Sequence, residues 1–197
     1  MKYDCERMIT ASQLQKLINR ITLYDDAIAY KELFLLYHPR LVSFAQSVTH
    51  SRESAEEVVS DVFLKIWTKR TTLTRIGNFH LYIYIVTKNI SINYLQKQKR
   101  ETAFSFDDTI VEIRSLGPDP EQIMISAEML KKVQLAIKAL PPKCQLIFKL
   151  VKEDGLKYRE VAELLDLSLK TVENQMTIAL KKIAQSIPFH IPKASLN

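Results

Sequence analysis

Amide, hydroxyl and cationic side chains are concentrated in one segment near the carboxyl end of the chain. Apolar residues have helical spacing from Tyr158 to Leu165 and from Leu169 to Ile183, with a short turn between. Two helices joined in this way can place the second helix in the major groove of DNA. The outward positions of that helix are Lys170, Thr171, Glu173, Asn174, Thr177, Lys181 and Lys182. Asn174 and Glu173 could read base edges, whereas the lysines and Thr171 could hold phosphates.

The residues of the turn agree with a helix-turn-helix. Ser168 can accept a backbone N–H and so cap the second helix. Asp166 occupies the turn position that glycine often fills, and aspartate is among the few residues that tolerate positive φ. The core between the two helices is expected to comprise Val161, Leu165, Leu167 and Val172. The alternative is an ordinary helical hairpin with a solvated outer face.

A second cluster, basic and aromatic, lies between Asn78 and Arg100, where the spacing predicts one long helix. We expect its buried stripe to comprise Phe79, Ile83, Val86, Ile90 and, at its end, Tyr94. The second half of the helix carries cations with no acid among them, and these could contact the phosphates of a nucleic acid: Lys88, Lys97, Lys99 and Arg100. Around the helix entrance, an amide, rings and a cation could hold an extruded base: Arg75, Asn78, His80 and Tyr82. Alternatively, the rings belong to the core and the lysines only complement the helix dipole.

The segment from Arg52 to Arg70 predicts a helix with one face suited to a partner. Its apolar stripe should face the core and comprises Ala55, Val58, Val59, Val62, Phe63, Ile66 and Trp67. Asp61, Leu64 and Lys65 lie beside this stripe. Leu64 on a partly polar face could meet a partner helix, although single exposed leucines are normal.

Residue patterns for catalysis or metal binding are missing from the sequence. It has no glycine-rich phosphate loop, no metal-ligand spacing and no nucleophile and base pair. We therefore expect no catalytic residues, no metal, no cofactor and no small-molecule substrate. Cys5 and Cys144 stand alone, and Cys144 lies in an apolar helix. Since no apolar run approaches about 20 residues and no signal-peptide core is present, we expect a cytoplasmic protein without direct membrane insertion.

Composition indicates which elements position these residues. Three glycines and 47% hydrophobic residues favour long helices over a turn-rich sheet. Helical spacing is interrupted at Pro39, at 49–53 and at 71–78. We predict an all-α chain of two helical domains joined by a linker, the second containing the helix-turn-helix. The boundaries are an extension at 1–24, a domain at 25–100, an acidic linker at 101–121, a domain at 122–187 and a tail at 188–197.

The net charge of +6 lies in the first half of the chain. Residues 1–100 hold fifteen Lys and Arg against nine Asp and Glu, whereas residues 101–197 hold thirteen of each. A basic first domain is typical of a polyanion binder, although a solvated surface could produce the same modest imbalance.

Two groups of motifs resemble one known family. Residues 56–67, EEVVSDVFLKIW, and 82–100, YIYIVTKNISINYLQKQKR, resemble conserved region two of the extracytoplasmic-function sigma factors of bacterial RNA polymerase. LPPKC at 140–144, GLKYREVA at 155–162 and KTVEN at 170–174 resemble region four. The order and spacing match over nearly the whole chain.

The resemblance implies a factor that binds core RNA polymerase, directs it to specific promoters and helps to melt the minus-ten region. The polymerase would bind Asp61, Leu64, Lys65 and Trp67. The minus-ten element would meet Arg75, Asn78, His80, Tyr82, Lys88, Asn89, Lys97, Lys99 and Arg100. The minus-thirty-five element would meet Tyr158, Arg159, Ser168, Lys170, Thr171, Glu173, Asn174, Thr177 and Lys181. The resemblance also implies an anti-sigma factor as a partner.

Two departures from the family pattern bear on promoter preference. Ile85 stands where the family often has a basic residue, and Asp166 replaces the usual turn glycine. The rival interpretation is a stand-alone helix-turn-helix transcription regulator with an N-terminal sensing or dimerisation domain. It predicts dimers and tight operator binding without polymerase.

Overall fold

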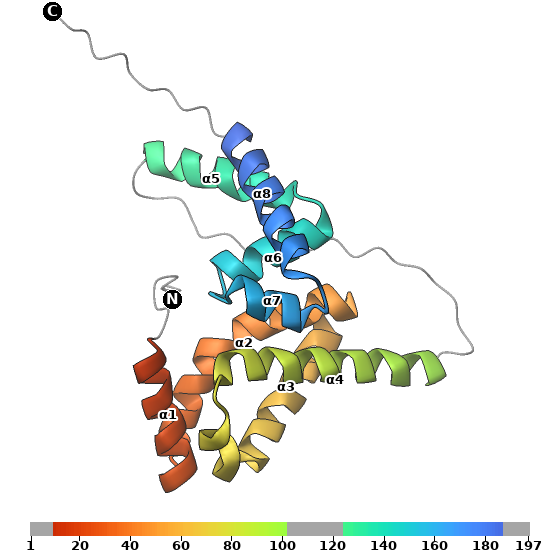
Figure 1. The fold of residues 1–197 in the computed structure, drawn as a ribbon. Helices are drawn as coiled ribbons and strands as arrows, with labels where there is room; N and C mark the ends of the chain where they lie inside the picture. Colours follow the sequence, from red (N-terminus) through yellow and green to blue (C-terminus); the bar gives the residue numbers. More distant parts are fainter. Residues whose placement is uncertain (1–9, 102–123, 187–197) are drawn as a thin grey trace, which may run out of the picture. The chain divides into compact units, whose positions relative to one another are not determined.

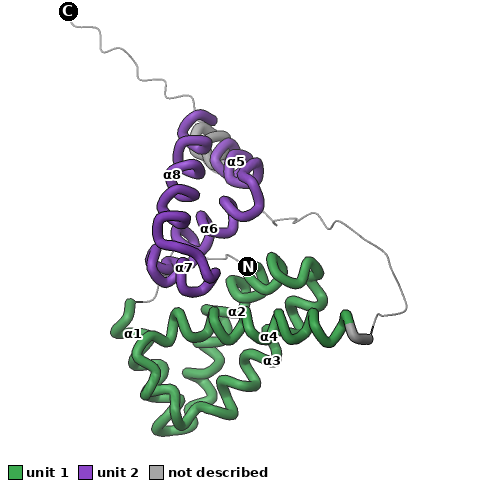
Figure 2. The backbone as a smooth tube through the Cα atoms, turned by 45° about the vertical axis from the view of Figure 1, so that its right-hand side comes forward, with its two compact units in different colours: residues 1–112 green, residues 113–197 purple. Residues whose placement is uncertain are grey.

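The computed structural model describes residues 10–101 and 124–186, which form helices and, within these ranges, no strand (Figure 1). The chain divides into two compact units, Met1–Glu112 and Ile113–Asn197 (Figure 2). The prediction of an all-α fold with two helical domains is confirmed. The expected linker, apart from Glu101, and the expected tail at 188–197 lie outside the described residues.

The first unit is a bundle of long helices. Its elements are α1 (Ala11–Tyr24), α2 (Ala27–Thr49), α3 (Arg52–Thr68), the 3-10 turn η1 (Arg70–Arg75) and α4 (Phe79–Glu101). Helices α2, α3 and α4 pack against one another, and α1 packs against η1 and α2. The apolar stripe expected for α3 is buried from Ala55 to Ile66, while Trp67 at its end is half-buried.

Short polar side chains determine where the helices of this unit begin. Asp26 Oδ1 accepts the backbone N–H groups of Ile28 and Ala29 at 2.9 and 3.0 Å, which satisfies two donors that the first turn of α2 leaves unpaired. The hydrogen bond from Ala29 and that from Arg20 hold the pKa of Asp26 below its ordinary value. Ser51 Oγ caps α3 by accepting the N–H of Ser54 at 3.3 Å.

The break in helical structure expected at Pro39 is not found, because Pro39 lies inside α2. A proline in a helix removes one donor, here the one that would reach the carbonyl of Leu35. Pro39 and Leu35 both lie on the exposed side of α2. Water can therefore satisfy that carbonyl, and the helix continues to Thr49.

Helix α1 contributes to the core of the first unit. Leu17, Ile18 and Ile21 are buried, and the Thr22 hydroxyl donates to the carbonyl of Arg70 at 2.9 Å. Thr10 begins the helix in a reciprocal cap with Gln13. The 3-10 turn that leads into α4 is thus packed against α1.

Residues 124–186 of the second unit form four helices. They are α5 (Met124–Lys138), α6 (Pro142–Lys152), α7 (Tyr158–Leu164) and α8 (Leu169–Ser186). Gly155 has φ 78°, where a side chain would be strained, and Leu156 N–H then donates to the carbonyl of Leu150 at 2.9 Å. Leu156 is buried there, so the break after α6 also closes the core.

Within residues 10–101 and 124–186, every helix is too short or too polar to cross a bilayer.

Candidate nucleic-acid interfaces

The turn between α7 and α8 has the geometry expected of a helix-turn-helix. Asp166 adopts φ 54°, and Leu167 N–H donates to the carbonyl of Ala162 at 2.9 Å. Ser168 Oγ accepts the N–H of Thr171 at 3.0 Å, which confirms the expected cap. Val161 and Val172 are buried between the helices. The expectations for Leu165 and Leu167 are wrong in detail, because both are only half-buried, whereas Leu164 is fully buried.

We expect Ser168→Ala to weaken the first turn of α8 by about 1 kcal/mol, because the Thr171 N–H loses its acceptor. Amide hydrogen exchange in α8 should then be roughly fivefold faster at its first turn. Ser186→Ala is the matched control, since the Ser186 hydroxyl donates to Lys182 at the other end of α8 and caps nothing. Equal exchange in both variants would contradict the cap.

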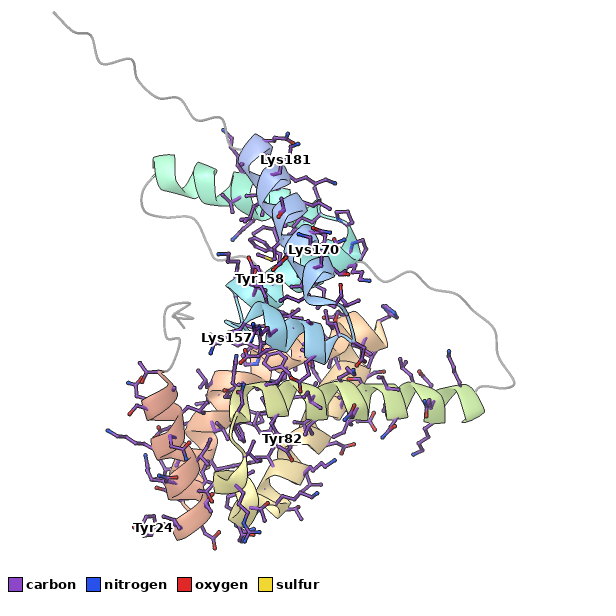
Figure 3. The ribbon with its side chains drawn as sticks, viewed as in Figure 1. Tyr24, Tyr82, Lys157, Tyr158, Lys170 and Lys181 are labelled. Atoms are coloured by element: carbon purple, nitrogen blue, oxygen red, sulfur yellow. The ribbon has the colours of Figure 1, made fainter. Side chains whose placement is uncertain are left out.

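The outer face of α8 holds most of the side chains expected to meet the minus-thirty-five element. At about 100° per residue, Lys170, Asn174, Thr177 and Lys181 fall on one side, and all four are exposed. Figure 3 labels Lys170 and Lys181 toward opposite ends of this helix. Glu173 and Thr171 flank the face and are half-buried.

Several of these side chains already make bonds within the chain. Lys170 Nζ lies 3.6 Å from Glu173 Oε2, and the hydroxyls of Thr171 and Ser168 are 2.8 Å apart. Thr177 Oγ1 donates to the carbonyl of Glu173 at 2.9 Å. Asn174 adds an exposed amide to this face, a group that can bond to base edges.

Tyr158 and Arg159 belong to α7, not to the face of α8. Arg159 is exposed and Tyr158 half-buried in the first turn of α7. The backbone N–H of Lys157 donates to Glu160 Oε2 at 2.7 Å and so fixes the beginning of this helix. Tyr158 and Lys157 are labelled in Figure 3. The exposed cation of Arg159 is a group that can hold a phosphate.

The entrance of α4 presents a face of amides. Asn78 Oδ1 accepts the N–H of Leu81 at 3.1 Å and thereby caps the helix. At about 100° per residue, Tyr82 and Asn89 follow Asn78 on one side. Asn93 and Gln96 continue that side and are exposed, a continuation that the sequence interpretation missed although helical spacing could have revealed it. Tyr82, labelled in Figure 3, is half-buried.

Cations border this amide face of α4. Lys97, Lys99 and, before the helix, Arg75 are exposed, while Lys88 is half-buried. The side chain of Arg100 lies outside the described residues. Because the backbone of nucleic acid is anionic, cations beside amides suit a surface that holds phosphates while the amides meet bases.

His80 is not brought together with the amide face. It lies on the opposite side of α4, where its Nδ1 is 3.0 Å from the hydroxyl of Tyr37. Its ring also packs edge-on against Tyr84 at 5.5 Å. Tyr37 is only 2% exposed, and burial raises the pKa of its hydroxyl, which therefore stays protonated. The ring of His80 thus faces the core.

The face of α3 expected to meet a protein partner is exposed. Asp61, Leu64 and Lys65 are all exposed, and Leu64 is 64% exposed. Trp67 differs, because its ring lies between the ring of Tyr30 at 4.8 Å and the guanidinium of Arg70 at 4.7 Å. Trp67 therefore supports the end of this face more than it projects from it.

No group of three or more His, Cys, Asp and Glu side chains among the described residues could hold a metal ion.

Known proteins resemble both units. Residues 33–101 match the family model of sigma-70 region 2, and residues 130–183 match that of sigma-70 region 4. The chain is 26% identical over 180 residues to the ECF RNA polymerase sigma-E factor of Escherichia coli strain K12, across 88% of this chain and 93% of that one. It is 24% identical over 191 residues to the RNA polymerase sigma-H factor of Pseudomonas aeruginosa, across 91% and 96%.

Solved structures share the fold. The sigma factor RpoE of Bartonella quintana, in complex with the anti-sigma factor NepR, aligns with a TM-score of 0.55 at 21% identity, over 80% of this chain and 95% of that one. CnrH, in complex with the cytosolic domain of CnrY, aligns with a TM-score of 0.50 at 17% identity, over 87% and 94%.

Two helical units, one with an amide-lined basic helix and one with a helix-turn-helix, define a DNA-binding initiation factor of bacterial transcription. The chain belongs to the sigma-70 family, in its extracytoplasmic-function group. It binds core RNA polymerase and directs it to specific promoters. Membership of this family disfavours the stand-alone regulator.

Proposed function

We propose that this sigma factor uses three separate surfaces, one for the polymerase and two for the promoter. Asp61, Leu64 and Lys65 on α3 contact core polymerase, with Trp67 supporting them. The amide face of α4, which begins at Asn78, meets the minus-ten element. The outer face of α8 meets the minus-thirty-five element. Each surface consists of exposed side chains on a helix whose opposite side is buried in its unit.

One observation carries this proposal most directly. The turn before α8 has the left-handed Asp166, the Ser168 cap and an outward row that runs from Lys170 to Lys181. A capped helix with an exposed amide and cations on its outer face is what major-groove reading requires. An ordinary hairpin requires none of these in combination.

The proposed mechanism uses binding energy and no covalent chemistry, so the protein acts as a non-enzymatic factor. Unstacking the minus-ten region costs a few kcal/mol per step. Contacts of Asn78, Tyr82 and Asn89 with unpaired bases would offset that cost, since rings stack on any base and amides bond to base edges. Neighbouring lysines would hold the phosphates. The factor would work in the cytoplasm, where polymerase and DNA meet.

The polymerase surface can be tested with one pair of leucines. We expect Leu64→Ala to weaken association with core polymerase at least fivefold, because burying a leucine side chain against a partner is worth about 1.5–3 kcal/mol. Leu35→Ala is the matched control, since Leu35 is 63% exposed on α2 but lies outside the proposed surface. Fluorescence titration of labelled factor with core polymerase measures both. Equal losses would mean that α3 is not the docking face.

The whole proposal is tested by run-off transcription from a promoter library, with core polymerase alone and with this protein added. Discrete new start sites, lost in an Asn78→Ala and Asn89→Ala double variant, are the expected result. Absence of new starts, together with tight binding of the protein alone to duplex DNA, would instead favour a stand-alone regulator.

A further partner is proposed from a relative. The structurally similar RpoE was solved bound to the anti-sigma factor NepR. We propose that an anti-sigma factor also restrains this chain. Co-purification from cells should then yield a second polypeptide that prevents association with core polymerase.

A further inference from the structure

Several outer polar groups of α8 are engaged in bonds within the chain, which limits what they can offer to a ligand. The hydroxyl of Thr177 gives its one proton to the carbonyl of Glu173, so toward a ligand it can only accept. Glu173 is paired with Lys170, and Thr171 with Ser168. Hydrogen bonding from Asn174 therefore accounts for only part of what this face could read.

Ile178 is an exposed apolar side chain of α8 that could contact a base in addition to Asn174. It is 42% exposed, although the packing of α8 is already supplied by another stripe, Val172, Met176, Ala179 and Ile183. It lies one helical turn after Asn174 and one turn before Lys181, so these two polar side chains are its neighbours on the helix surface. Because polar residues surround it, Ile178 forms a small apolar spot and not part of a broad protein-docking patch.

The major groove offers one apolar group to such a spot, the 5-methyl of thymine. Asn174, by contrast, has the donor and acceptor that match adenine. The two residues are four apart, which corresponds to about 6 Å along the helix. Base pairs are about 3.4 Å apart, so both side chains can reach positions within about two base pairs of each other.

We propose that Ile178 is a specificity-determining residue that contacts the 5-methyl group of a thymine in the minus-thirty-five element. That thymine lies within about two base pairs of the base read by Asn174. The inference rests on the proposed function of α8 and adds the chemistry of one position to it.

Removing one methyl group from the DNA tests this contact directly. The probe is a duplex promoter chosen by the run-off experiment, in which each thymine of the minus-thirty-five element is replaced in turn by deoxyuridine. Holoenzyme made from the full chain and core polymerase is titrated against each duplex. We expect one substitution to weaken binding about fourfold, the contribution of one buried methyl group. With Ile178→Ala, that same substitution should change nothing.

Leu180→Ala is the matched control, because Leu180 is 46% exposed on the opposite flank of α8. It should keep the full sensitivity to deoxyuridine. Equal sensitivity of wild type and Ile178→Ala at every thymine would overturn the inference, as would an element without thymine. In both of these cases the holoenzyme would still transcribe from the promoter. If the proposed function itself were wrong, the protein would not support transcription at all.

Discussion

Replacing Ile21 by alanine is expected to destabilise the first unit by about 2–5 kcal/mol, the usual cost of emptying a fully buried isoleucine site. Ile21 is 0% exposed, and its helix packs against η1 and α2. Leu17 and Ile18 are buried on the same helix. Urea unfolding of the full chain, followed by circular dichroism, should show a lower midpoint for the transition of this unit.

Leu23→Ala provides the comparison within the same helix. Leu23 is 67% exposed, so its truncation should change stability by no more than about 0.5 kcal/mol. Helix propensity cannot explain a larger loss of stability in Ile21→Ala, because alanine improves on isoleucine in a helix at least as much as it improves on leucine. If the midpoint fell no further in Ile21→Ala than in Leu23→Ala, α1 would not pack on the unit in solution.

The contribution of α1 was hard to predict from sequence, because a short amphipathic helix does not reveal its partner. Leu17, Ile18 and Ile21 show one apolar side, yet nothing local indicates that η1 will cover it. Thr10 and Gln13 do form a recognisable capping pair, which the sequence interpretation did not use. Helix beginnings depend on neighbouring residues, whereas packing depends on distant ones.

The parts predicted well depend on short-range signals. Ser168, Asp166 and the apolar stripe of α3 are examples, since a cap, a positive φ and a helical period are each determined within a few residues. Pro39 shows the limit of such signals. Its effect depended on whether the carbonyl of Leu35 faces water, which only the tertiary structure decides.

The buried face of α4 was predicted only in part: Phe79, Ile83 and Val86 are buried as expected, but the buried face is wider than that stripe. Thr87 and Ser91 are fully buried, with hydroxyls that donate to the carbonyls of Ile83 and Thr87 at 2.8 Å. Hydroxyls satisfied by their own helix can enter a core, so a hydropathy pattern counts them on the wrong side. Including them moves the centre of the buried face toward His80.

Replacing His80 by alanine should therefore act first on stability and not on DNA. The buried hydroxyl of Tyr37 would lose its partner, at a cost of about 1–3 kcal/mol. In a Tyr37→Phe background the same substitution should cost clearly less, because the hydroxyl that needs a partner is gone. Urea unfolding of the two single variants and the double variant measures this coupling.

Asn89→Ala separates the two sides of α4. Asn89 is exposed on the amide face, so its loss should leave the free energy of unfolding within about 0.5 kcal/mol of that of the wild type. It should nevertheless slow promoter opening, which permanganate footprinting of the minus-ten region detects. The opposite pattern for His80→Ala, with unchanged stability and a strong opening defect, would mean that the imidazole turns outward to DNA. In that case the bond to Tyr37 would be dispensable, and the resemblance alone would have placed His80 correctly.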